Sequence, residues 1–321
     1  MKNGSDKTIS VEKRALLISK ILREKGFETE IIRYPKEKRS LDILVKDLSL
    51  VKVAEDTKDL NHKGFRDLLA ISASTKASPL MISEKIEDEH IESGIIFEKN
   101  GVRVVNLETF IAYLNGEKIS IYEWRGSFYI KIDHKKLREM REKARMSLGD
   151  LAERLGVSRK SVYEYERDLM DPDIDHGERL IDLFGEEIVG SIDLLSKTEY
   201  EIDRMKLIKR LAKISSAEDK IVNKINREGL SAVRLYRTAP DIVGVFEEES
   251  FMIVIDDHRK AVEERIQKIN EAMKFSKSFR IRSFIAGKDL NEEIIRDIKE
   301  SRAEIISLDR LGRELKEFIR R

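Results

Sequence analysis

Several residue types are rare or missing in this sequence of 321 residues. It contains no cysteine, four prolines, one tryptophan and five histidines spread along the chain. The lack of cysteine excludes disulfide frameworks and thiolate metal sites, and the scattered histidines argue against a histidine-rich one. No apolar run approaches the roughly 18 residues of a membrane span, and the N-terminal MKNGSDKT has no signal-peptide core. We therefore expect a cytoplasmic protein with no membrane partner.

Charge of either sign is abundant but balanced. Lys and Arg total 62, Asp and Glu total 61, and the formal net charge is +1. The chain as a whole therefore has no field that would attract a polyanion, and nucleic-acid binding needs a local basic patch. Hydrophobic residues make up 40% of the chain, which indicates a folded protein, and its length suggests two or three domains. Glutamine occurs once, at Gln267, and this scarcity beside many Lys, Arg and Glu residues is typical of thermophiles.

Helical and strand patterns alternate over residues 1–118, which predicts an α/β domain. The expected order is a helix (9–26), three strands (28–34, 41–46, 50–55), a helix (62–76), a strand (79–83), two more strands (94–98, 102–106) and a helix (107–114). Residues 119–132 are expected to form a connecting hairpin that turns at Arg125-Gly126.

The α/β alternation returns over residues 218–321, after a helical linker predicted at 197–217. Short matches recur there in the order of the first domain: KILREKGF at 20–27 with KINREGL at 224–230, Tyr34 with Tyr236, Asp42 with Asp241, MISEKI at 81–86 with FIAGKD at 284–289, and VVNLETF at 104–110 with IISLDRL at 305–311. Their nearly constant offset favours an internal duplication over the chance similarity of two small α/β domains.

Residues 133–196 are expected to form a central all-α domain with helices at 135–145, 148–155, 159–168 and 175–184. Ser147 and Ser158 stand where helix N-caps are expected, and Gly156 suits the tight turn between the second and third helices. The motif SLGDLAERLGVSRKSVYEYERD resembles the Cro/repressor-type helix-turn-helix family of DNA-binding domains, and the resemblance covers about 50 residues.

This resemblance implies that the helix after Ser158 enters the major groove of DNA. It also implies a structural ion pair between Arg141 and Glu166. Leu148 departs from the family, which usually has at this position a glutamine that touches the DNA backbone. The resemblance assigns the DNA-binding surface to Ser147, Ser158, Arg159, Lys160, Ser161, Tyr163 and Glu164.

The charges of this segment agree with such a surface. Between His134 and Asp168 there are ten basic and seven acidic residues, a local excess in a nearly neutral chain. Arg159 is expected to read guanine bidentately, whereas Lys160 is expected to meet phosphate. The competing interpretation is an ordinary solvated charged face.

A second constellation lies in the first domain. Asp42 opens one expected strand, and Asp56 and Lys58 come at the end of the next, two residues apart. Paired carboxylates with a lysine can hold Mg²⁺ and polarise a phosphate. The pattern and the expected topology resemble the PD-(D/E)XK nucleases, including archaeal Holliday-junction resolvases. The alternation of side chains leaves open whether Glu55 or Asp56 faces the metal, and the repeat has Arg259 where the lysine would stand.

Three interpretations of the α/β domain follow: a nuclease-like fold without catalysis, which we favour, an ordinary α/β domain, or an active Mg²⁺-dependent nuclease. The whole arrangement resembles an archaeal family of helix-turn-helix transcriptional regulators. We expect a sequence-specific regulator that binds double-stranded DNA as a homodimer, without enzyme activity, bound metal or cofactor. The alternatives are a metal-dependent nuclease or junction resolvase directed by the helix-turn-helix, and a helix-turn-helix that serves protein contacts only.

Overall fold

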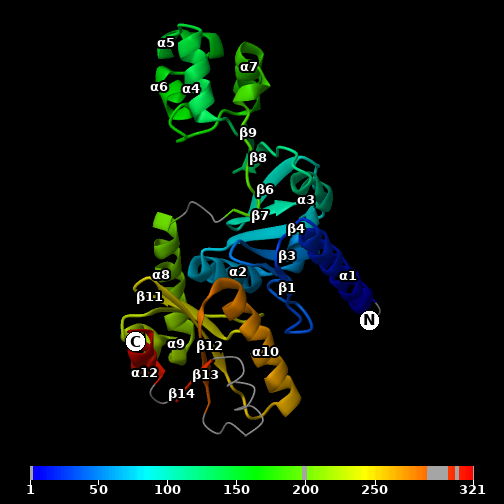
Figure 1. The fold of residues 1–321 in the computed structure, drawn as a ribbon, viewed down its shortest axis with the longest axis vertical. Coiled ribbons are helices and arrows are strands. Elements are labelled where there is room, and N and C mark those ends of the chain that lie inside the picture. The colour runs from blue at the N-terminus through cyan, green and yellow to red at the C-terminus, as the bar shows by residue number, and fades with distance from the viewer. Residues whose placement is uncertain (1–2, 197–200, 288–302, 308–310, 321) are drawn as a thin grey trace. The chain divides into compact units, whose positions relative to one another are not determined.

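The computed structural model describes residues 3–196, 201–287, 303–307 and 311–320 (Figure 1). The chain forms two compact units, one from residues 1–81 and 195–321 and the other from residues 82–194. The first unit thus combines the start of the first predicted α/β domain with the second one. None of the helices in the described ranges is long and apolar enough to cross a membrane.

The N-terminal half of the first unit has the predicted order of one helix, three strands, a helix and a strand. Its elements are α1 (Asn3–Glu24), β1 (Thr29–Ile31), β2 (Ile43–Val45), β3 (Ser49–Asp56), the 3₁₀ turn η1 (Thr57–Asp59), α2 (His62–Thr75) and β4 (Ser78–Ile86). The strands lie in the order β1-β2-β3-β4, and the first three are antiparallel. Most residues of β2 and β3 are buried, so both faces of these strands are covered.

The C-terminal half of the first unit repeats this order. Its elements are α8 (Glu201–Glu218), α9 (Lys220–Arg227), β10 (Ser231–Arg234), β11 (Ile242–Phe246), β12 (Glu249–Ile255), α10 (Val262–Phe279), β13 (Arg282–Ala286), β14 (Glu304–Ile306) and α12 (Leu311–Arg320). The sheet order is β10-β11-β12-β13-β14, with antiparallel pairs up to β12 and parallel pairs after it. The matches predicted at 284–289 and 305–311 lie partly outside the described residues.

The two halves of the first unit contact each other reciprocally. Asp67 on α2 accepts hydrogen bonds from the backbone N–H groups of Tyr236 and Arg237, in the loop after β10. Glu271 on α10 accepts one from the N–H of Arg33, in the loop after β1, at 2.6 Å. A helix of each half therefore holds the equivalent loop of the other half, as in a symmetric dimer.

Tyr34 and Tyr236, the tyrosines of these two loops, each contact a lysine of the opposite half. The ammonium of Lys63 on α2 lies 4.5 Å from the ring centre of Tyr236, and the ammonium of Lys260 lies 5.8 Å from that of Tyr34. The Lys260 ammonium also donates to the Tyr34 hydroxyl at 3.1 Å. These are cation–π contacts that join the halves in both directions.

Asp67 makes this interface sensitive to pH. Burial raises the pKa of Asp67 from 3.8 to about 6. Its proton is therefore bound more tightly in the folded state, and the stability it contributes is fully present below pH 3.8 and is lost as the pH rises through 6. Relative to Asp67→Asn, the free energy of unfolding of the wild type should fall by about 2 kcal/mol between pH 4 and pH 7. Urea unfolding of both proteins across this range measures the difference, and a difference independent of pH contradicts the assignment.

The second unit joins a small sheet to the helical domain. Its sheet elements are the end of β4, β5 (Glu89–His90), β6 (Ile95–Lys99), β7 (Val102–Val105), α3 (Leu107–Leu114), β8 (Ile121–Trp124) and β9 (Ser127–Ile130). The predicted hairpin is present as β8 and β9, and it turns at Arg125-Gly126, where both residues have positive φ. It does more than connect, because Ile130 and Ile132 are buried in the core of the helical domain.

The helical domain contains α4 (His134–Lys143), α5 (Leu148–Leu155), α6 (Arg159–Tyr165), α7 (Ile174–Phe184) and the 3₁₀ turn η2 (Glu186–Ile188). The helices begin within one residue of their predicted starts. Helix α6 ends earlier than expected, because the chain turns at Asp168, which has a φ of 56°. The core includes Leu137, Leu151, Leu155, Val162 and Leu180.

Candidate nucleic-acid interface

Local capping fixes the turn between α5 and α6. The Ser147 hydroxyl accepts from the N–H of Asp150, whose carboxylate accepts from the N–H of Ser147, a reciprocal capping box. Gly156 ends α5 in the left-handed conformation, with a φ of 76°. The Ser158 hydroxyl then accepts from the N–H of Ser161 at 3.0 Å and starts α6. Ser147, Ser158 and Ser161 therefore have a structural role whether or not they touch a ligand.

The first turn of α6 faces solvent. Ser158, Arg159, Lys160 and Tyr163 are exposed, whereas Ser161 and Glu164 are half-buried. Within the described ranges, Arg159 forms no ion pair. Lys160 lies 3.5 Å from the carboxylate of Glu164, one helical turn away, and its side chain is 80% exposed. An exposed pair of this kind is weak and exchanges easily for another anion.

An ion pair holds α6 against α4, as the resemblance implied. The Arg141 guanidinium donates to the Glu166 carboxylate at 2.5 and 3.0 Å, and to the backbone oxygen of Met146 at 2.7 Å. The pair is largely buried, and the hydrogen bond to Glu166 raises the pKa of Arg141, so the guanidinium stays charged. It therefore fixes the angle at which α6 is presented.

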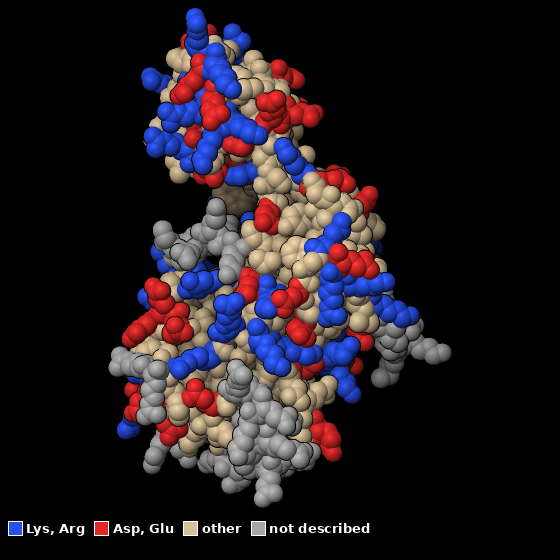
Figure 2. Space-filling view, in the orientation of Figure 1, with Lys and Arg blue, Asp and Glu red and all other residues tan. Residues whose placement is uncertain are grey.

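Basic side chains are unevenly distributed over this domain. Figure 2 shows Lys and Arg gathered over the part formed by α4, α5 and α6, with acidic side chains prominent over α7. Helix α7 and the turn after it carry Asp175, Glu178, Asp182, Glu186 and Glu187. The local field therefore favours a polyanion on the α6 side.

Three of the four residues of the nuclease hypothesis lie at the end of β3, and each has a partner within the protein. The Glu55 carboxylate pairs with Arg14 of α1 at 2.7 Å. Asp56 caps η1 by accepting from the N–H of Lys58 at 3.0 Å, and the Lys58 ammonium lies 3.6 Å from the same carboxylate. Strand alternation stops at Asp56, because the chain turns into η1 there. In the described residues, no three His, Asp or Glu side chains form a group that could hold a metal.

Asp42 has both carboxylate oxygens occupied by cations of the protein. Oδ1 accepts from the Nε of Arg39 at 3.1 Å. Oδ2 accepts from the Nζ of Lys52 at 2.9 Å and from the backbone N–H of Val53 at 2.9 Å. Asp42 is 1% exposed and Lys52 is 7% exposed, so this cluster is closed to solvent.

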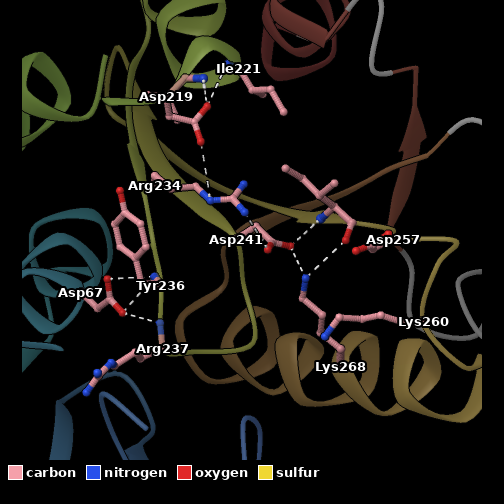
Figure 3. Close-up of polar contacts among 12 residues, drawn as sticks. Asp67, Asp219, Ile221, Arg234, Tyr236, Arg237, Asp241, Asp257, Lys260 and Lys268 are labelled. Atoms are coloured by element: carbon pink, nitrogen blue, oxygen red, sulfur yellow. Dashed lines mark hydrogen bonds and ion pairs between the residues drawn. The ribbon is translucent and has the colours of Figure 1, made fainter. Parts of the chain in front are cut away.

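Asp241 has an equivalent set of contacts in the C-terminal half (Figure 3). Oδ1 lies 3.4 Å from the Nη2 of Arg234. Oδ2 accepts from the Nζ of Lys268 at 2.5 Å and from the backbone N–H of Ile255 at 2.6 Å. Figure 3 shows Lys268 reaching Asp241 from α10, while Arg234 approaches it from the end of β10.

A Mg²⁺ ion does not fit the residues around Asp42. Mg²⁺ requires oxygen ligands in near-octahedral geometry. Here Lys52, directly across the strand pair from Asp42, supplies an ammonium where a second carboxylate would be needed. Neither Lys52 nor Arg39 was among the residues predicted from the sequence. The signal that could have revealed Lys52 is the register of the hairpin, in which Ile43 lies opposite Val51 and so places Asp42 opposite Lys52.

Comparison with known proteins gives independent results. Residues 14–119 match the model of a PD-(D/E)XK superfamily domain, and residues 137–190 match a helix-turn-helix model. A protein of Sulfolobus acidocaldarius is 32% identical over 84% of this chain and 88% of its own length. Proteins of Sulfurisphaera tokodaii, with 32% identity over 85% and 89%, and of Aeropyrum pernix, with 30% identity over 84% and 87%, are similar in the same way. All three are named "Putative HTH-type transcriptional regulatory protein".

This chain belongs to that archaeal family. The predicted resemblance is confirmed, as are the nuclease-like α/β domain and the helix-turn-helix domain. No solved structure matches the chain.

Proposed function

We propose that this protein is a sequence-specific transcriptional regulator that places α6 in the major groove of DNA, in the manner of Cro/repressor-type domains. One observation carries the proposal: the first turn of α6 is exposed and presents Arg159 free of any ion pair within the described ranges. A guanidinium in that position is available for the bidentate contact with guanine, which is worth about 1–3 kcal/mol of discrimination. The names of the relatives support a regulatory role.

The protein is proposed to act as a homodimer. One recognition helix covers too few base pairs for tight specific binding, and this chain has one matched helix-turn-helix domain. The two half-sites should lie about 34 Å apart, or at a multiple of that spacing, so that both helices meet the same face of the duplex.

The α/β halves of the first unit are proposed to be an internal duplication without nuclease activity. The order of their elements, the reciprocal contacts of Asp67 and Glu271, and the equivalent hydrogen bonds of Asp42 and Asp241 support a common origin. The occupied carboxylates and the names of the relatives support the lack of catalysis. These halves then serve dimerisation or sensing.

The test of the DNA-binding proposal compares two neighbouring residues. Arg159→Ala is expected to change the preferred DNA sequence, measured by selection from a random library, because it removes base contacts. Lys160→Ala is expected to weaken all sequences alike and to reduce the slope of log affinity against log salt by about one unit, because it removes one phosphate contact.

Arg138→Ala is the matched control. Arg138 pairs with Glu142 one helical turn away on the surface of α4, much as Lys160 pairs with Glu164, but it lies outside the proposed surface. This variant should keep both sequence preference and salt slope. A changed preference in Lys160→Ala together with an unchanged one in Arg159→Ala would overturn the assignment.

A further inference from the structure

The carboxylates of Asp42 and Asp241 are neutralised in the same way in both halves. In each, one oxygen faces an arginine, Arg39 or Arg234. The other oxygen accepts from a backbone N–H of the neighbouring strand and from a lysine ammonium. Repetition of three such contacts at two carboxylates 199 positions apart argues against chance placement of the charges.

The two lysines reach their carboxylates from different elements. Lys52 lies on β3, directly across the strand pair, whereas Lys268 lies on α10 and reaches Asp241 from a helix. The residue of β12 that corresponds to Lys52 by the shared backbone hydrogen bond is Val254, which has no charge. The halves therefore conserve the position of the ammonium group and not the residue that supplies it.

The Lys52 ammonium excludes a metal ion from the Asp42 oxygen that it contacts. A divalent cation at this carboxylate would lie about 2.0–2.6 Å from the oxygen that accepts from Lys52 at 2.9 Å, so the two cannot be bound together. The other carboxylates at the strand ends are also taken: Glu55 pairs with Arg14, and Asp256 accepts from Arg265 at 2.7 and 2.5 Å. Asp56, at the end of β3, caps η1 and lies 3.6 Å from the Lys58 ammonium, so in the described part of the chain each of these three carboxylates already has a partner.

We propose that the Lys52 and Lys268 ammonium groups take the place of the divalent cation of a nuclease-like site, so that removing either lysine leaves the Asp42 or Asp241 carboxylate without its cation, and an added alkylammonium can then replace it. This inference deepens the proposed lack of catalysis and is independent of DNA binding. It assigns each cluster a structural purpose, because the lysine balances a buried carboxylate that would otherwise need another cation.

The experiment measures thermal unfolding of the full chain with and without cations. Lys52→Ala should lower the unfolding temperature by roughly 10 °C, because it leaves the buried Asp42 carboxylate without its lysine partner. Ethylammonium chloride should restore part of this loss, whereas NaCl at equal ionic strength should not, and MnCl₂ should not because no second carboxylate is available to hold the metal. The wild type should show no such response, and calorimetric titration with MnCl₂ should detect no site that depends on Asp42 or Asp241.

The matched control is Asp42→Asn/Lys52→Ala, which removes the charge that needs a cation. It should be insensitive to MnCl₂ and to ethylammonium. Lys268→Ala and Asp241→Asn/Lys268→Ala repeat the comparison in the C-terminal half, where the two side chains are somewhat less buried.

Each outcome decides between the proposals. Rescue of the single variants but not of the double variants supports the inference. Absence of rescue in both single variants overturns it, as does a Mn²⁺ site in the wild type that Asp42→Asn abolishes. A parallel assay with branched and linear DNA and Mg²⁺ tests the proposed function separately: cutting by the wild type that is lost in Asp42→Asn refutes the lack of catalysis, whereas failed rescue without cutting refutes only the lysine substitution.

Discussion

Replacing Asp67 with alanine is expected to lower the free energy of unfolding of the first unit by about 3 kcal/mol or more at pH 5. The Asp67 carboxyl is fully buried and contacts the Ser40 hydroxyl at 2.7 Å and the N–H groups of Tyr236 and Arg237 at 3.1 and 2.8 Å. Alanine leaves these donors without their acceptor, and each buried donor without a partner costs about 1–3 kcal/mol. At pH 5 the carboxyl is mostly protonated, so the cost of burying its charge does not offset the loss.

The loss should be concentrated where the two halves meet. Hydrogen exchange should accelerate at the amides of Tyr236 and Arg237, which donate to Asp67 in the wild type, and less at strands within each half. Asp47→Asn is the matched control, because Asp47 pairs with Arg280 across the same unit at 3.7 Å with both side chains substantially exposed, and asparagine tolerates the φ of 57° at this position. That variant should cost less than about 1 kcal/mol. Equal losses in the two variants would contradict the assigned role of Asp67.

The helical domain was predictable in detail because its signals are local. Ser147, Gly156 and Ser158 form their capping hydrogen bonds within three or four residues, so each helix boundary is determined by nearby sequence. The Arg141–Glu166 pair spans 25 positions and was available only through the family resemblance. The order of helices and strands in the α/β segments was likewise visible from periodicity, since alternation needs no knowledge of distant contacts.

The nuclease-like site was not predictable from spacing. Spacing placed Asp56 and Lys58 together, and their side chains are indeed close, but Asp42 and Glu55 are occupied by partners from elsewhere. Arg14 meets Glu55 from α1, and Lys268 meets Asp241 from α10, 27 positions along the chain. Such partners are fixed by tertiary packing. The sequence match of Asp42 with Asp241 was a better guide to the structure than the spacing, because both carboxylates accept a hydrogen bond from a backbone N–H of the neighbouring strand.

Replacing Glu166 with alanine tests whether the ion pair with Arg141 is needed to hold α6 in place. Glu166→Ala leaves the buried Arg141 guanidinium without its partner. The free energy of unfolding is expected to fall by about 3–5 kcal/mol, the usual loss when one partner of a buried ion pair is removed. The helix-turn-helix match covers only residues 137–190, and a domain of this size has little stability to lose. DNA affinity should therefore vanish together with the helical fold, measured by circular dichroism and by hydrogen exchange of α4, α5 and α6.

A second variant of the same pair distinguishes packing from charge. Arg141→Met/Glu166→Leu replaces both ions with apolar side chains and should lose far less stability than Glu166→Ala, because no charge is left unpaired. Glu142→Ala, which removes an exposed carboxylate 3.6 Å from the same guanidinium, should change stability by less than about 1 kcal/mol. If the double variant folds and keeps the sequence preference, the ion pair only positions α6. If it folds but loses the preference, the charges of the pair themselves contribute to reading DNA.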